Sequence, residues 1–186
     1  GTVHIDVVLD AEVYTDAHQL FLDICDRVGI QPAQVLLVWM SPPCDTYAKC
    51  DSINQGKRAN HREFSREQWH NSNLALLSGA RCAVTQLALR HDSLTKLTYT
   101  LLLVLWTLYG IPGAMENPHA SMRLVPGMRS LLLREEVQVQ EVNYCVFDHP
   151  YWKLTDIFHT LPGLALQGCT GNGRCLKWGH CMDRWG

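Results

Sequence analysis

Residues 35–44 read Val-Leu-Leu-Val-Trp-Met-Ser-Pro-Pro-Cys, a hydrophobic run that passes directly into a proline loop with a cysteine. The run predicts a buried strand over residues 34–40. Proline fixes its own φ and restricts the residue before it, so Pro42 and Pro43 would hold the Cys44 thiol in a defined position. Ligands and catalytic groups collect at the carboxyl ends of strands in open α/β sheets. Cys44 is therefore a candidate nucleophile, and the alternative is an ordinary buried cysteine.

Short apolar runs joined by polar or helical stretches recur along the chain, which is typical of an α/β fold with a parallel sheet. Residues 3–9 and 114–116 read as strands, and residues 137–142 alternate apolar and polar side chains as a half-buried strand does. A further apolar piece spans residues 20–24. Leucines at helical spacing predict a helix over residues 94–108, which we expect to pack against the sheet.

Composition narrows the class of protein. With 186 residues, 47% of them hydrophobic, the chain has enough apolar material for one domain with a real core. A net charge of −2 argues against a strongly basic nucleic-acid module, although a local basic groove stays open. The eight cysteines lack the spacing of a secreted disulfide framework, so we expect a reducing, intracellular compartment, either cytoplasm or nucleus. The longest apolar stretch, residues 101–106, is too short to span a membrane, and we expect no membrane partner.

Glu116 is the second candidate for chemistry. It ends an apolar run and precedes the turn formed by Asn117 and Pro118, much as Cys44 follows the earlier run. In a parallel sheet the two residues would lie at the same edge. A carboxyl group in a cleft there could hold or deliver a proton, whereas the alternative is that Glu116 only braces its own loop.

The order of these motifs resembles that of the DNA (cytosine-5) methyltransferases, and most closely a compact branch found in phage and mobile elements. The matching segments are Ser41-Pro42-Pro43-Cys44, Glu116-Asn117-Pro118, Asn143-Tyr144-Cys145, Lys153-Leu154-Thr155-Asp156-Ile157, and Cys169, Cys175 and His180. The resemblance implies a Rossmann-like methyltransferase sheet with flanking helices over residues 1–160, followed by an irregular Cys- and Trp-rich extension over residues 161–186. The Gly-rich first motif of the family has no counterpart in the chain, so we expect its N-terminal strand to be missing, either because the sequence is a fragment or because the fold has lost that half of the cofactor site.

The resemblance also implies a role for each residue. Cys44 would add to carbon-6 of a cytosine flipped out of DNA, Glu116 would hold the ring N3 and amino group, and Lys153 would lie near the cytosine carbonyl. Carbon-5 of the base would then take the methyl group of S-adenosylmethionine. The residues implied for the cofactor are Asp6, at the ribose hydroxyls, Asp23, at the adenine amino group, Ser41 and Pro42. Those implied for the substrate are Pro43, Asn117, Pro118 and Thr155. For both aspartates, the alternative is an ordinary loop-capping role.

Cysteines near the C-terminus could bind a metal ion. Cys145, Cys169, Cys175 and His180 would supply the four ligands of a structural zinc site, with Cys181 as the alternative to His180, although their spacing is not that of a standard knuckle. The alternative is a set of free thiols in a tail. Two other functions stay open beside the enzyme. One is a catalytically inactive, methyltransferase-like domain, with or without zinc, that binds nucleic acid or a protein. The other is a zinc-dependent nucleic-acid module unrelated to methyltransferases.

Overall fold

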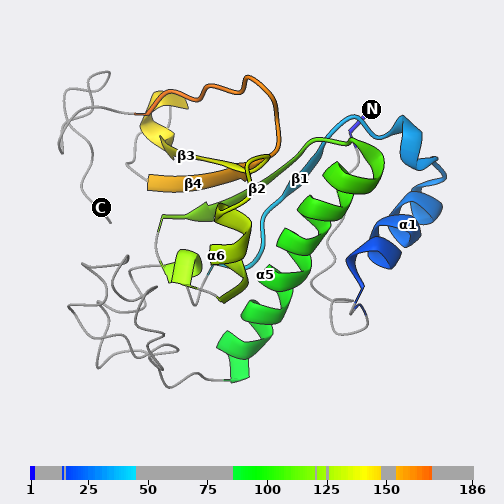
Figure 1. Ribbon diagram of the computed structural model, residues 1–186, viewed down its shortest axis with the longest axis horizontal. Helices are drawn as coiled ribbons and strands as arrows, with labels where there is room; N and C mark the ends of the chain where they lie inside the picture. Colours follow the sequence, from blue (N-terminus) through cyan, green and yellow to red (C-terminus); the bar gives the residue numbers. More distant parts are fainter. Residues whose placement is uncertain are drawn as a thin grey trace.

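The computed structural model of the protein describes residues 1–2, 14, 16–44, 86–119, 121–124, 126–147 and 154–168. Its centre is a four-stranded sheet with the strand order β1-β2-β4-β3 (Figure 1). The strands are β1 (Val38–Met40), β2 (Gly113–Pro118), β3 (Gln138–Asn143) and β4 (Leu154–His159). β1 and β2 are parallel, whereas β4 lies between β2 and β3 and is antiparallel to both. The α/β class is therefore confirmed, but the expectation of a parallel sheet is wrong, because β4 makes the sheet mixed.

The strand expected over residues 34–40 is shorter in the structure. Residues Pro32–Gln34 form a 3₁₀ turn, which is closed by a hydrogen bond from the Val35 N–H to the Pro32 carbonyl (3.1 Å). Val35 is already extended, but β2 begins only at Gly113, whose partner is Val38, so pairing between the strands begins there. Hydrophobicity alone predicted the longer strand because it does not show where the partner strand begins.

The first helix, α1 (Ala17–Val28), is limited by specific residues at both ends. The carboxylate of Asp16 accepts a hydrogen bond from the His18 N–H (2.7 Å), which satisfies a backbone donor in the first turn. Gly29 ends the helix with a φ of 69°, a left-handed conformation that glycine adopts without strain. The apolar piece at residues 20–24 is part of this helix.

The central helix, α5 (Gln86–Val104), continues as a π-helical turn over Leu105–Tyr109 and ends at Gly110. The helix predicted over residues 94–108 is therefore confirmed. Glycine is needed where this helix crosses β2, because a Cβ at Gly113 would lie only 2.7 Å from Cδ1 of Leu102.

Helix α5 forms the middle of the core. One side of α5 packs Leu102 against Met115 and Phe158 of the sheet, together with residues of α6 (Pro126–Leu132). Another side packs against α1, which lies alongside it (Figure 1). The opposite face of the sheet is covered in part by the segment after β4, whose Leu161 and Leu166 contact a small buried cluster of sheet residues. The sheet is therefore covered by helices on one face and by an irregular segment on the other.

Candidate functional site

The carboxyl ends of β1 and β2 lie side by side. Because these strands are parallel and Met40 pairs with Met115, the loop after β1 and the end of β2 emerge at the same edge of the sheet. That loop contains the half-buried Cys44, and the end of β2 contains Glu116. The two motifs singled out in the sequence are thus neighbours in space.

A side chain from one motif is bonded directly to the other. Asn117 is fully buried, and its Nδ2 donates a hydrogen bond to the carbonyl oxygen of Pro42 at 3.2 Å. Pro42 and Pro43 are themselves stiff, so this bond fixes the loop two residues before Cys44. A buried hydrogen bond of this kind is costly to lose, because the amide and the carbonyl would then lack a partner.

Glu116 points to the opposite face of the sheet from Asn117, because side chains alternate along a strand. Its Oε1 accepts a hydrogen bond from the hydroxyl of Tyr144 at 3.0 Å. The two residues line a pocket of about 340 Å³ whose other described walls are apolar: Trp39, Val142, Phe147, Ile157 and Leu166. Cys44 lies in the adjoining loop, outside the described lining of the pocket. A carboxylate and a phenol in an apolar recess suit a flat, polar-edged ligand such as a nucleobase.

The remaining sequence-predicted residues lie in several places. Ser41 is exposed in the loop after β1, and Pro118 pairs with Thr155 of β4. Asp23 lies on α1, where its carboxylate accepts a hydrogen bond from Nε2 of Gln19 (2.6 Å), an ordinary helix-surface pair. Thr155 is fully buried, and its hydroxyl makes no hydrogen bond within the described part of the chain.

Several predicted site residues lie outside the described residues: Asp6, Lys153, Cys169, Cys175 and His180. Of the four expected zinc ligands, only Cys145 is described, and it is buried in the 3₁₀ turn Tyr144–Phe147 that follows β3. The extension over residues 161–186 is described only as far as Gly168. Within that part, the backbone of Leu164 and Leu166 is bonded to the side-chain amide of Gln140 in β3.

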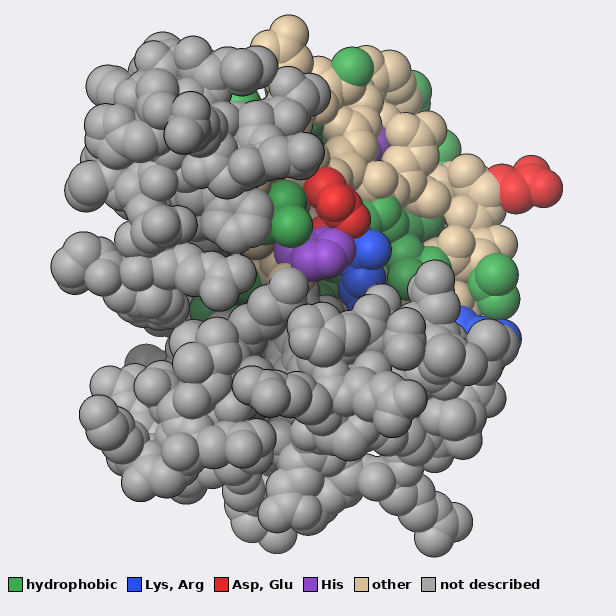
Figure 2. Space-filling model, turned by 90° about the vertical axis from the view of Figure 1, so that its left-hand side faces the viewer, with side chains coloured by type: hydrophobic (Ala, Val, Ile, Leu, Met, Phe, Trp, Pro, Cys, Tyr) green, Lys and Arg blue, Asp and Glu red, His purple; other side chains and the backbone are tan. Residues whose placement is uncertain are grey.

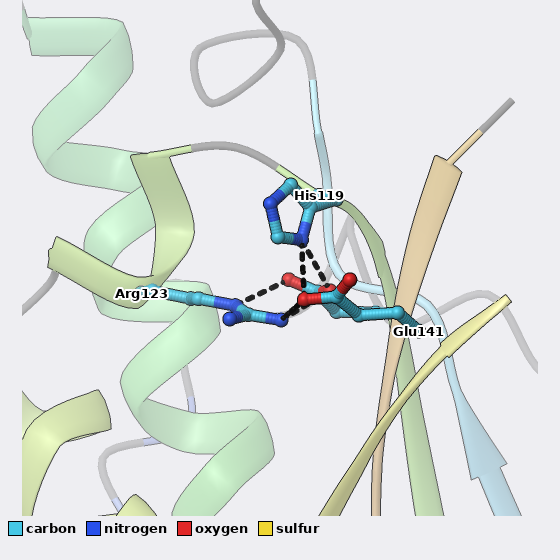
Figure 3. A network of polar contacts seen from close by, with 4 residues as sticks. His119, Arg123 and Glu141 are labelled. Carbon is cyan, nitrogen blue, oxygen red and sulfur yellow. Dashed lines mark hydrogen bonds and ion pairs between the residues drawn. The ribbon is translucent and has the colours of Figure 1, made fainter. Parts of the chain in front are cut away.

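A polar cluster on the helix-covered side of the sheet was not expected from the sequence. It consists of His119, Arg123, Glu141 and Asp156, which come from the end of β2, the following 3₁₀ turn Ser121–Leu124, β3 and β4. Figure 3 shows His119, Arg123 and Glu141 converging, and Figure 2 shows purple, blue and red side chains meeting at this surface. Asp156 lies in the matched segment 153–157, but no motif in the sequence links it to the other three residues of the cluster.

The centre of this cluster is the buried carboxylate of Asp156. Arg123 donates two hydrogen bonds to this carboxylate, from Nε to Oδ2 (2.7 Å) and from a terminal nitrogen to Oδ1 (2.6 Å). His119 Nδ1 lies 2.8 Å from Oδ1. Burial by itself raises the pKa of the Asp156 carboxyl, but the bonds and charges of His119 and Arg123 outweigh burial and hold that pKa below its ordinary value. Asp156 is thus a buried anion with a cation fixed beside it.

The same residues have the donor set of a metal site. One ligand atom each from His119, Glu141 and Asp156 lie within 4.8 Å of one another. However, Arg123 donates to the very oxygens a metal would use, Oδ1 of Asp156 and Oε1 of Glu141 (3.0 Å). A divalent cation would have to displace a guanidinium of the same charge sign. The cluster therefore fits an ion-pair network that ties β2, β3 and β4 together behind the Glu116 motif, and not a metal centre.

His159 is a second buried polar group, at the end of β4. Its Nδ1 accepts a hydrogen bond from the Leu161 N–H (3.2 Å), which places the ring proton on Nε2. Nε2 has no partner within the described residues, and burial lowers the pKa of His159 below its ordinary value. The folded protein therefore favours the neutral imidazole.

We expect this histidine to make the protein sensitive to mild acid. As the pH falls below about 6.5, the unfolded chain takes up a proton at His159 and the folded chain does not, so stability falls until the folded pKa is reached. Urea unfolding should show a loss of about 1 kcal/mol between about pH 7.5 and about pH 5.5 that is absent from H159Q. The variant H18Q, which changes a histidine on α1, should keep the loss; an equal loss in H159Q and the wild type would contradict the assignment.

No protein-family model, curated protein or solved structure matches this chain. Among the described helices, none is both long enough and apolar enough to cross a bilayer.

Proposed function

We propose that this chain carries the catalytic centre of a DNA (cytosine-5) methyltransferase. The observation that carries the proposal is the hydrogen bond from Asn117 to Pro42, which joins the loop of Cys44 to the strand end of Glu116 at one edge of the sheet. A nucleophile and an acid–base group that emerge from adjacent parallel strands can act on the same ring. The resemblance of the sequence to the family indicates that this ring is a cytosine base.

Cys44 and Glu116 would have different roles in the transfer of the methyl group. The Cys44 thiolate adds to carbon-6 of cytosine, and the electron pair of the 5,6 double bond moves to carbon-5. Glu116 holds N3 and the amino group, which favours the protonated ring that accepts the thiolate. After carbon-5 has gained the methyl group, loss of its proton restores the double bond and expels the Cys44 thiolate. S-adenosylmethionine supplies the methyl group when it is bound.

Two of the residues implied for the methyl donor, Ser41 and Asp23, are at least partly exposed, whereas Pro42 is buried. Ser41 lies in the loop beside Cys44, and the Asp23 carboxylate accepts a hydrogen bond from the side chain of Gln19. A hydroxyl and a carboxylate are suitable partners for the polar groups of a nucleoside. DNA is the proposed partner, and the pocket beside Glu116 is the proposed place of the flipped base.

A DNA duplex that contains 5-fluorocytosine tests the proposal. The fluorine replaces the proton that must leave carbon-5, so the enzyme stays bonded to the base and migrates as a heavier species on a denaturing gel. With S-adenosylmethionine present, we expect the wild-type chain to form this adduct, C44S to form none, and E116Q to form it about 100-fold more slowly.

The control variant is C25A, which changes a buried thiol on α1 and should still be trapped. Binding of the duplex without any adduct in the wild type would overturn the enzyme and favour a nucleic-acid-binding domain that has no catalytic function. An adduct in C44S would show that a different thiol attacks the base.

A further inference from the structure

The hydroxyl group of Tyr144 reaches the proposed catalytic carboxyl from the turn that follows β3, across β4. Tyr144 opens the 3₁₀ turn after β3, and its hydroxyl donates to Oε1 of Glu116 at 3.0 Å. Both side chains line the same pocket, between apolar walls that include Trp39 and Ile157. A hydrogen bond to a charged oxygen is stronger where apolar walls exclude water.

The phenol is itself held in place by its neighbours in the chain. Asn143, just before it, is buried and pairs with Leu154 of β4, and Cys145, just after it, is also buried. The backbone on both sides of Tyr144 is thus anchored in the core. A tyrosine ring has few rotatable bonds, so an anchored backbone leaves the hydroxyl little freedom. The donor is therefore organised before any ligand arrives.

Glutamate differs in this respect, because its side chain has more rotatable bonds than that of tyrosine and can adopt several rotamers on a strand. A carboxyl group that must bond to both N3 and the amino group of a base has to be held in a defined orientation. We propose that Tyr144 is a positioning residue, which fixes the orientation of the Glu116 carboxyl toward the base; this inference rests on the proposed function. Tyr144 takes up one lone pair of Oε1 and so fixes one edge of the carboxyl.

A double-mutant cycle on the full chain tests the role of Tyr144. The rate of adduct formation with the 5-fluorocytosine duplex is measured for the wild type, Y144F, E116A and the double variant. We expect Y144F to slow the wild type about tenfold, and to change the rate of E116A by less than about twofold, because the hydroxyl then has no carboxyl to orient. The Kd for the duplex should change by less than about twofold in Y144F, since positioning affects the reaction more than binding.

The matched control is Y109F, which removes a phenol hydroxyl that is bonded to His18 (2.6 Å) on α1. It should form the adduct at the wild-type rate. A Y144F rate equal to wild type, an equal slowing of E116A, or a Y144F protein that does not fold would overturn the positioning role and leave the proposed function standing. Absence of an adduct with the wild type would overturn the proposed function, and the role of Tyr144 with it.

Discussion

Replacement of Arg123 by methionine is expected to lower the free energy of unfolding by about 3 kcal/mol. Methionine keeps much of the side-chain volume but leaves the Asp156 carboxylate, whose side chain is 2% exposed, without its main cation. An uncompensated buried charge is among the most destabilising changes a point substitution can make. His119 still contacts Asp156, which keeps the expected loss at the lower end of the usual range. Urea unfolding at neutral pH measures the effect.

The control for this substitution is R134M. Arg134 lies 3.5 Å from Glu136 in an exposed ion pair, and such a pair contributes no more than about 1 kcal/mol. The combination of R123M with D156N should recover part of the lost stability, because the neutral amide needs no cation. If R123M were as stable as R134M, the cluster would not be a buried ion pair in solution.

The pH dependence of this effect has a defined sign. In the wild type the Asp156 pKa is lowered, so the stability that comes from its ionised form is present above the ordinary pKa and is lost as the pH falls through the folded pKa. In R123M the same carboxyl is buried without the guanidinium and takes up a proton more readily. The stability difference between the two proteins should therefore narrow on acidification.

Replacement of Asn117 by alanine is expected to slow adduct formation with the 5-fluorocytosine duplex about 100-fold. Alanine removes the donor that holds the Pro42 carbonyl, so the loop of Cys44 is no longer fixed relative to β2. A displacement of the thiol by about 1 Å is enough for a loss of this size. Glu116 and Cys44 themselves are unchanged in N117A, so the effect would come from their relative placement.

The control for N117A is T160V, which changes a residue just after β4 that is bonded to the other end of β2. Thr160 is buried, and its hydroxyl accepts a hydrogen bond from the Gly113 N–H at 3.0 Å, so valine also removes a buried bond to β2. Urea unfolding should show a similar loss of about 1 kcal/mol in both variants, while only N117A slows the adduct. Equal trapping rates for N117A and T160V would show that the bond to Pro42 has no part in the chemistry.

The elements that the sequence predicted well are those fixed by local interactions. The leucine stripe over residues 94–108 lies in α5 and its π-helical continuation, and the alternating stretch over residues 137–142 differs from β3 by one residue. β4 was not expected as a strand, because it carries Asp156 and His159 among its buried residues. These polar residues are tolerated there only because Arg123, His119 and the Leu161 backbone bond to them.

The sequence by itself determined the α/β class, the main helix, and the two motifs at the ends of parallel neighbours β1 and β2. Apolar periodicity and proline stiffness act over a few residues, so a reader of the chain can recognise them directly. Only the tertiary structure decided that β4 enters between β2 and β3, that Arg123 meets Asp156, and that Tyr144 meets Glu116. Those contacts join residues that are 33 and 28 positions apart in the chain. They stabilise the fold because a buried polar group is costly without a partner, and the partner can come from any element of the folded protein.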